Sequence, residues 1–291
     1  MPSSRNPIPS LEPLPLQLPP GSVLWWSIDV GTLSADVMEC ASRILSGAEL
    51  DRISRLRRST QRNEALISRA ALRLILSWFC GVPAQHWVLA PDAFGRPVVK
   101  APATHGIPCF NVSHRQGQVH ICIRWDGAVG IDVEYVDDDF DFMLVAQSVL
   151  SSSEMLHLTE VHESIRKRTF FRHWVVKEAY VKALGLGLSK DLTRVELISR
   201  GQHEWHLRVD CTHGDDPGLW QICPEDTSSR HVAAMVTTGT PVLSPLPCFR
   251  VIASPEDFLK LLESELTRRS CRNERTDRLQ ADPTGNGQGR P

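Results

Sequence analysis

The segment WVVKEAYVKALGLGL, residues 174–188, places one acid and two lysines in an otherwise apolar stretch. Glu178 and Lys182 are four residues apart, so on a helix they share one face, whereas Lys177 and Tyr180 point elsewhere. A carboxylate in such a pair can accept a proton or bind a metal ion, while the ammonium group can hold an anion. A solvated ion pair is the more common use of this spacing, so the pair alone does not establish a site.

A second pair of acids lies in AVGIDVEYV, where Asp132 and Glu134 are two residues apart and interrupt an apolar run. In a strand both side chains point to the same face. Two neighbouring carboxylates repel each other when partly buried, unless a cation joins them. Together with Glu178 they would form a site of three carboxylates, which suits hard divalent cations and Mg²⁺ above all. Two acids on the solvated face of a sheet are the ordinary alternative.

The segment NVSHRQG is a candidate phosphate site because it brings Ser113, His114 and Arg115 to the end of a predicted strand. Hydroxyl, imidazole and backbone amide donors at such a place can converge on an anion. Without the other two motifs, a polar hairpin loop that binds nothing is the simpler interpretation.

Periodicity and turn signals predict the elements that position these residues. A strand is expected in SVLWWSIDVG, and a capping box at Ser46 and Glu49 starts a helix that carries the arginines of DRISRLRRSTQR. A longer helix, NEALISRAALRLILSWF, should end at Gly81. FGRPVV is a turn that enters an extended segment, and QVHICIRW and AVGIDVEYV should form a hairpin around Asp126 and Gly127.

In the second half, a capping box at Ser151 and Glu154 is followed by a basic link, RKRTFFRH at 166–173, and a helix over residues 170–184. A last helix begins at SPEDFLKLLESEL, with Pro255 in its first turn. Strands are expected in LTRVELISR, EWHLRVD, LWQIC and HVAAMVTT.

The composition excludes several classes of protein. The chain has 291 residues, is 42% hydrophobic and carries a formal net charge of -2, so no overall field favours nucleic acid or a membrane surface. Its apolar runs are too short and interrupted to span a bilayer, and its start does not resemble a signal peptide. The 8 cysteines form no Cys-x-x-Cys pair, so we expect free thiols in a reducing cytosol.

Four segments occur in the order and at the distances found in the Sfp-type 4′-phosphopantetheinyl transferases, a family that this chain resembles over roughly residues 23–240. They are FGRPVV, FNVSH, GIDVE and WVVKEAYVKALGLGL. The patterns W-x-x-K-E-x-Y-x-K and G-I-D-x-E together are highly specific, and RAALRLIL looks like the family's long first-half helix. Members of the family move the phosphopantetheine arm of coenzyme A onto a serine of a carrier protein and release 3′,5′-ADP.

The resemblance implies an α+β fold, a pseudo-dimer of two similar α/β halves with the active site between them. The expected divisions of the chain are a disordered Pro-rich leader, an N-terminal half, a C-terminal half with the metal site and a disordered tail: 1–22, 23–126, 127–269 and 270–291. A cytoplasmic monomer is expected.

Residue roles also follow from the resemblance. Asp132, Glu134 and Glu178 are expected to bind Mg²⁺ with the pyrophosphate of coenzyme A, and Glu178 is also the expected general base. Lys182 should contact the phosphate beside the scissile bond, and Trp174 is expected to be a packing residue. The residues expected to contact coenzyme A are Gly95, Arg96, Asn111, Ser113, Asp132 and Lys182. Arg52, with Arg55 as a competitor, and His114 are expected to contact its 3′-phosphate.

The partner implied by the resemblance is an acyl or peptidyl carrier protein, and its pathway (fatty acid, polyketide, nonribosomal peptide or lysine-type synthesis) is left open. The basic segment 166–173 is a candidate docking surface, although Phe170 and Phe171 fit a core position equally well. Two other functions compete: a catalytically weak module that binds coenzyme A or a carrier, and a generic Mg²⁺-dependent nucleotide-binding enzyme, such as a phosphohydrolase. The intact acids and Lys182 argue against the first, and the lack of a phosphate-binding glycine loop argues against the second.

Overall fold

The computed structural model describes residues 21–103, 106–185, 191–199, 205–209, 219–239 and 248–280. The predicted leader up to residue 20, Cys211 and the last eleven residues of the predicted tail, 281–291, lie outside the described residues. Cys40, Cys80, Cys109 and Cys122 are free thiols, as predicted. None of the helices in the described ranges is long and apolar enough to cross a membrane.

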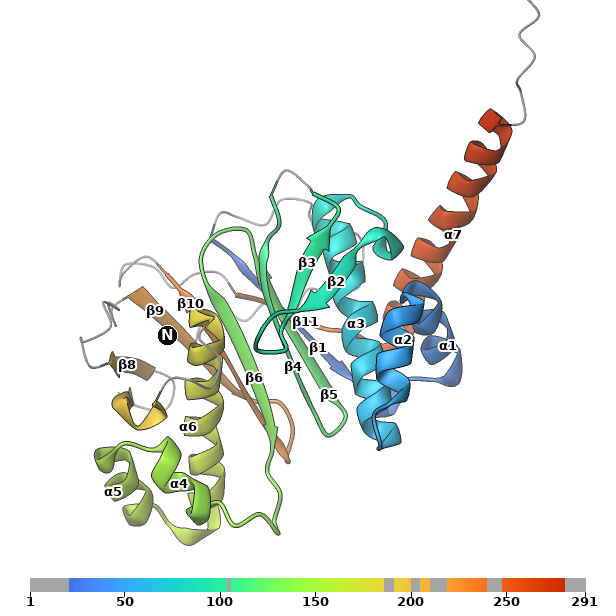
Figure 1. Cartoon of the computed structure of the whole chain (residues 1–291). Coiled ribbons are helices and arrows are strands. Elements are labelled where there is room, and N and C mark those ends of the chain that lie inside the picture. The colour runs from blue at the N-terminus through green and yellow to red at the C-terminus, as the bar shows by residue number, and fades with distance from the viewer. Residues whose placement is uncertain are drawn as a thin grey trace, which may run out of the picture.

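One half of the molecule is a four-stranded sheet covered by a long helix, α3 (Ser59–Cys80) (Figure 1). The strand order is β11 (Cys248–Ile252), β1 (Val23–Asp29), β5 (Gln118–Arg124) and β4 (Cys109–Arg115). The side chains of β1 alternate, so that Trp26 packs in the core beneath α3 and Trp25 packs toward the second sheet. Gly81 ends α3 in the left-handed conformation, as its position predicts.

Smaller elements surround this half. They are the helices α1 (Ala35–Ile44), α2 (Gly47–Ser54) and α7 (Pro255–Gln280), and the ribbon of β2 (Val88–Pro91) and β3 (Pro97–Ala101). The capping box at Ser46 and Glu49 is present, but its helix ends at Ser54, so the arginine-rich segment is divided between α2, a short connection and α3. Helix α7 continues past residue 270, where the polar tail was expected to begin.

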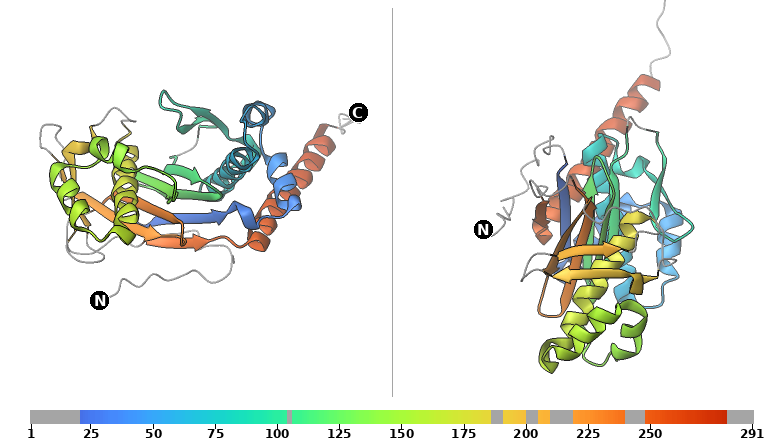
Figure 2. Two further views of the ribbon diagram at one scale, coloured as in Figure 1. Left: turned by 90° about the horizontal axis from the view of Figure 1, so that it is seen from below. Right: turned by 90° about the vertical axis from the view of Figure 1, so that its left-hand side faces the viewer.

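The second half is a three-stranded sheet covered by α6 (Glu163–Leu184). The strand order is β6 (Val129–Tyr135), β10 (His231–Thr238) and β9 (Trp220–Asp226). Helices α4 (Met143–Val149) and α5 (Ser152–Glu160) and the hairpin of β7 (Val195–Ser199) and β8 (Trp205–Val209) lie on the α6 side of this sheet (Figure 1, Figure 2). The α+β prediction is therefore confirmed.

The predicted hairpin between QVHICIRW and AVGIDVEYV is wrong. β5 pairs with β4, and β6 instead pairs with β10 in the other sheet. The chain changes sheets at the Asp126–Gly127 turn, and side chains rather than a strand ladder join β4 to β6. Asn111 Oδ1 accepts a hydrogen bond from Ile131 N at 3.3 Å, and Ser113 Oγ accepts one from Val133 N at 3.3 Å. An apolar cluster that includes Trp25 and Met235 fills the space between the sheets.

Helix α6 begins at Glu163, earlier than the predicted residue 170, so the segment 166–173 is helical and is not a link. Phe170 and Phe171 are buried in the core, and Arg168 and Arg172 both pair with Asp226. The arginines of the predicted docking surface are therefore largely used in internal contacts.

Gly130 allows α6 to rest directly on β6. A Cβ atom at this position would lie 2.0 Å from the carbonyl oxygen of Ala179 and 2.5 Å from the nitrogen of Ala183, both on the backbone of α6. Because a backbone cannot rotate away as a side chain can, any larger residue must push the helix off the sheet. This close approach brings Glu178 and Lys182, in the fifth and sixth turns of α6, to Asp132.

We expect Gly130→Ala to destabilise the fold by about 1–3 kcal/mol or more, because the added methyl group overpacks a backbone contact. Chemical denaturation measures the change. Gly47→Ala is the matched control, since no atom lies within 4 Å of the corresponding Cβ position. Equal stability of the two variants would contradict the role given to Gly130.

Candidate active site

The centre of the site is an ion pair between Asp132 on β6 and Lys182 on α6, which belong to two different sequence motifs. Lys182 Nζ lies 2.5 Å from Asp132 Oδ1 and 3.2 Å from Ser113 Oγ, and Ser113 donates a 2.9 Å hydrogen bond to the same Asp132 oxygen. Ser113 comes from β4, so both sheets and α6 meet at this point. The aspartate is buried, whereas Lys182 retains 27% of its side-chain exposure.

The other two predicted acids flank this pair, and the cluster carries excess negative charge. Arg115 Nε lies 3.1 Å from Glu134 Oε2, yet burial and the charge of Asp132 raise the pKa of Glu134 to about 7. Burial and Asp132 also raise the pKa of Glu178, against the opposing influence of Lys182 and of a hydrogen bond from Trp174. Carboxyl groups whose ionised forms are disfavoured in this way provide proton acceptors near neutral pH and ligands for a cation.

The carboxylate oxygens of this cluster suit a hard divalent cation, but they do not converge on one position. Among the described residues, no three His, Cys, Asp or Glu side chains converge on one metal position. Lys182 and Ser113 occupy Asp132 Oδ1, and Arg115 holds Glu134. Asp132 Oδ2, however, is buried without a hydrogen-bond partner, which is costly unless something joins it. Asp132, Glu134 and Glu178 are thus the residues that would hold Mg²⁺.

Glu178 also lines a cavity of about 200 Å³. Trp174 and Val181 of α6 form its apolar side, while Val149 and Leu192 belong to the segments that face α6. Trp174 was predicted only to pack. It does stack on Phe171, but its hydrogen bond to Glu178 also holds the carboxylate at the edge of the cavity.

His114 follows Ser113 on β4 and points the other way, toward α3. Its Nδ1 lies 3.2 Å from Glu64 Oε2, and the other oxygen of Glu64 accepts the Gly117 amide at 2.7 Å. The side chain of His114 is 39% exposed, whereas that of Glu64 is 6% exposed. The structure therefore separates the predicted phosphate motif into two contacts, with Ser113 at the acids and His114 at the surface.

The remaining predicted coenzyme A residues occupy different surroundings. Gly95 has a positive φ of 82° in the β2–β3 turn, and Arg52 is exposed on α2, as is Arg55 just after it. Arg96 pairs with Asp92 and donates a 3.3 Å hydrogen bond to the carbonyl oxygen of Lys182, so it caps the end of α6. Asn111 uses its side-chain oxygen to join the sheets, as described above.

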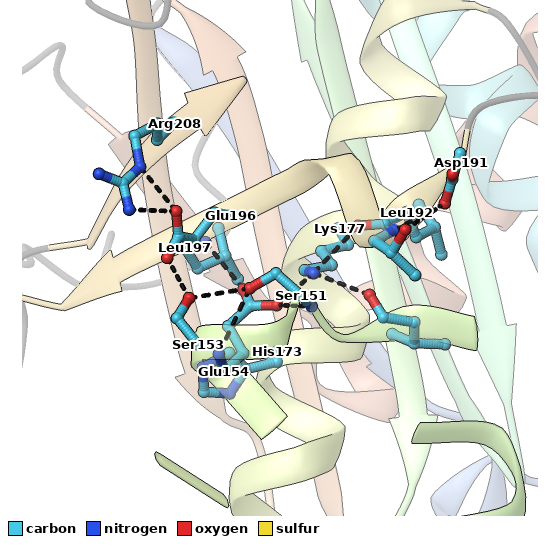
Figure 3. A network of polar contacts seen from close by, with 12 residues as sticks. Ser151, Ser153, Glu154, His173, Lys177, Asp191, Leu192, Glu196, Leu197 and Arg208 are labelled. Atoms are coloured by element: carbon cyan, nitrogen blue, oxygen red, sulfur yellow. Dashed lines mark hydrogen bonds and ion pairs between the residues drawn. The ribbon is translucent and has the colours of Figure 1, made fainter. Parts of the chain in front are cut away.

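Lys177, to which the sequence assigned no role, is a fully buried structural cation (Figure 3). Its Nζ lies 2.5 Å from Glu154 Oε2 and donates to the carbonyl oxygens of Val149 at 2.7 Å and Leu192 at 3.1 Å. Glu154 accepts in turn from the amides of Ser151 and Leu197. Since Val149 and Leu192 line the cavity beside Glu178, Lys177 attaches two walls of that cavity to α6.

Sequence reasoning missed three contacts of the site, and each left a signal. Glu64 lies on the apolar face of a helix, at i, i+3 and i+7 spacing with Ile67 and Ala71, which is an unusual place for an acid. Glu154 was assigned as a cap only, yet an adjoining helix supplies the buried Lys177 as its counter-charge. For Trp174 the signal is its indole N–H, a hydrogen-bond donor that apolar packing alone leaves without an acceptor.

The raised pKa of Glu134 predicts a pH effect on stability. The folded state holds this proton more tightly than the unfolded state, so the stabilisation is present below about pH 4.5 and is lost as pH rises through about 7. We therefore expect the melting temperature in EDTA to fall more steeply between pH 5 and pH 7.5 for the wild type than for Glu134→Gln.

Comparing the slopes of melting temperature against pH for the two proteins removes contributions from other groups. These include His120, His173 and His231, whose pKa values are lowered mainly by burial. Parallel slopes for wild type and Glu134→Gln would show that this carboxyl group titrates normally. Added Mg²⁺ should raise the melting temperature of the wild type more at pH 7.5 than at pH 5.5, because metal ligands must be deprotonated.

The family model and the relatives that match this chain are all described as phosphopantetheinyl transferases. Residues 128–236 match the model of the 4′-phosphopantetheinyl transferase superfamily. The 4′-phosphopantetheinyl transferase HetI of Nostoc sp. is 28% identical over 74% of this chain and 86% of its own length. The L-aminoadipate-semialdehyde dehydrogenase-phosphopantetheinyl transferase of Xenopus laevis is 26% identical over 60% of this chain and 61% of its own length.

Solved structures were also matched. A holo-(acyl-carrier-protein) synthase from Bacillus anthracis, crystallised in complex with CoA (3′,5′-ADP), is 19% identical over 38% of this chain and 94% of its own, with a TM-score of 0.33. The match to the holo-[acyl-carrier-protein] synthase of Thermotoga maritima covers 38% of this chain and 62% of the other, at 26% identity and a TM-score of 0.32.

Proposed function

Since residues 128–236 match the model of the 4′-phosphopantetheinyl transferase superfamily, we propose that the chain is a member and transfers the 4′-phosphopantetheine group of coenzyme A to a serine of an acyl or peptidyl carrier protein, in an Mg²⁺-dependent reaction. The observation that carries the proposal is the meeting of Asp132, Ser113 and Lys182 beside Glu134 and Glu178. A cationic hydrogen-bond donor, Lys182, and several carboxylates at one point suit the binding of a pyrophosphate substrate.

In the proposed reaction, the serine oxygen of the carrier attacks the β-phosphorus of coenzyme A. The new bond joins that oxygen to phosphorus, and the bond between the β-phosphorus and the bridging oxygen breaks, which releases 3′,5′-ADP. Serine is a weak nucleophile and must lose its proton during attack. Glu178 accepts that proton, since its raised pKa makes it a better base than an ordinary glutamate and it borders a cavity.

Other residues bind and orient the phosphates. Lys182 exchanges its contact with Asp132 for a phosphate oxygen next to the scissile bond and neutralises charge on the leaving group. Mg²⁺, bound by Asp132, Glu134 and Glu178, would screen the charge of the pyrophosphate. Ser113 binds an inner phosphate oxygen, and His114 binds the 3′-phosphate at the surface.

The adenylate end of coenzyme A is assigned to the first half of the molecule. Gly95 in its exposed turn, Arg96, Arg52 and Asn111 are the proposed contacts. Arg96 would keep its hydrogen bond to the end of α6 and thereby link adenylate binding to the helix that carries Lys182.

The proposal is tested by mass spectrometry of apo carrier proteins incubated with the protein, coenzyme A and Mg²⁺. We expect the mass gain of one phosphopantetheine group, lost when EDTA is added. No gain with several carriers, while coenzyme A still binds in calorimetry, would replace the enzyme by a module that binds coenzyme A. Release of 3′,5′-ADP without any carrier would instead indicate a phosphohydrolase.

A further inference from the structure

Helix α3 contributes a buried acid to the surface where β4 and β5 turn. Glu64 sits in the first half of α3, is 5% exposed and has both carboxylate oxygens engaged. One oxygen fixes the β4–β5 turn through the Gly117 amide, in a turn whose residues Gln116 and Gly117 both have positive φ. The other meets His114 Nδ1. Burying a carboxylate on an apolar helix face costs folding free energy, so its presence there suggests a specific role.

The carboxylate of Glu64 is ionised. Burial alone would raise its pKa, but the hydrogen bonds from His114 and Gly117, with the charges of His114 and Arg115, lower the pKa below its ordinary value. An ionised carboxylate only accepts hydrogen bonds, so the proton between the two side chains belongs to His114 Nδ1. The ring is thereby fixed in orientation, and its second nitrogen, Nε2, is directed away from Glu64 on a side chain that is 39% exposed.

We propose that Glu64 is a positioning residue that holds His114 as a cationic donor for the 3′-phosphate of coenzyme A. The inference rests on the proposed function, which places a phosphate monoester at His114. An anion at Nε2 requires a proton on that nitrogen, and the imidazole is then a cation between two anions. Glu64 balances this charge and orients the ring, in the way that a carboxylate supports a metal-binding or catalytic histidine.

The closest alternative is that Glu64 only ties the turn to α3. Charge decides between the two roles. Glutamine keeps the shape of Glu64, can still accept the Gly117 amide, and can donate to His114 Nδ1, but it supplies no counter-charge. A purely structural Glu64 would therefore tolerate glutamine, whereas a Glu64 that supports a cation would not.

The test is a steady-state comparison of Glu64→Gln and wild type with two substrates, coenzyme A and 3′-dephospho-coenzyme A, using carrier modification as the readout. We expect KM for coenzyme A to rise about tenfold in the variant, as for a lost charge-assisted contact, with kcat retained. KM for 3′-dephospho-coenzyme A should not change. Glu39→Gln, which removes an exposed acid of α1, controls for the loss of one negative charge.

His114→Gln completes a double-mutant cycle, and adding Glu64→Gln to it should have no further effect on KM. The inference is overturned if KM for coenzyme A is unchanged or falls in Glu64→Gln, or if KM rises equally for both substrates. These outcomes are distinct from failure of the proposed function. If the proposed function fails, the wild type itself transfers no phosphopantetheine, and the role of Glu64 is rejected together with that function.

Discussion

Glu178→Gln should lower kcat for carrier modification by about 10²- to 10⁴-fold, the usual contribution of a general base. Glutamine has nearly the same volume and can still accept the hydrogen bond from Trp174, so the cavity wall should be preserved. Glutamine cannot accept the proton, and it offers Mg²⁺ no full negative charge. Initial rates by mass spectrometry at saturating coenzyme A measure the effect.

Two controls separate chemistry from folding in this experiment. Glu163→Gln changes an exposed acid on the same helix and should leave kcat unchanged. The melting temperature of Glu178→Gln in EDTA should equal or exceed that of the wild type, because removing an acid with a raised pKa relieves repulsion with Asp132. A Glu178→Gln enzyme with nearly full kcat would assign the proton to another group, and Glu134 would be the first candidate.

The pairing of these residues on shared faces was predictable because local spacing determines it. Glu178 and Lys182 share a helix face, and Asp132 and Glu134 share a strand face, whatever else the chain does. The structure adds why these two faces meet. Gly130 lies two residues before Asp132 and four before Glu134 on the same face of β6, and its missing side chain lets α6 approach.

Contacts between distant segments were not predictable from one sequence. β11 pairs with β1 across more than two hundred residues, and no local pattern in CFRVI indicates that partner. The Asp126–Gly127 turn has the composition of a hairpin, yet β6 joins another sheet, because its apolar face is buried between the sheets and its backbone pairs with β10. Turn residues specify a reversal of the chain but not which strand receives it.

Lys177→Met should destabilise the protein by about 3–5 kcal/mol, because it leaves Glu154 buried without its counter-charge. The carbonyl groups of Val149 and Leu192 also lose a donor, so two walls of the cavity beside Glu178 are released from α6. Urea denaturation followed by circular dichroism measures the loss, and kcat should fall even where the variant is fully folded. Lys260→Met is the control, since that side chain is 75% exposed.

The double variant Lys177→Met with Glu154→Gln tests whether the ion pair is the cause. Glutamine can still accept from the amides of Ser151 or Leu197 but carries no charge. If the uncompensated carboxylate causes the loss, the double variant should be more stable than Lys177→Met alone. If the two losses add, the lysine acts mainly through its hydrogen bonds to the two carbonyl groups. The difference matters for the proposed function, because those bonds connect α6, which carries Glu178, to the cavity walls.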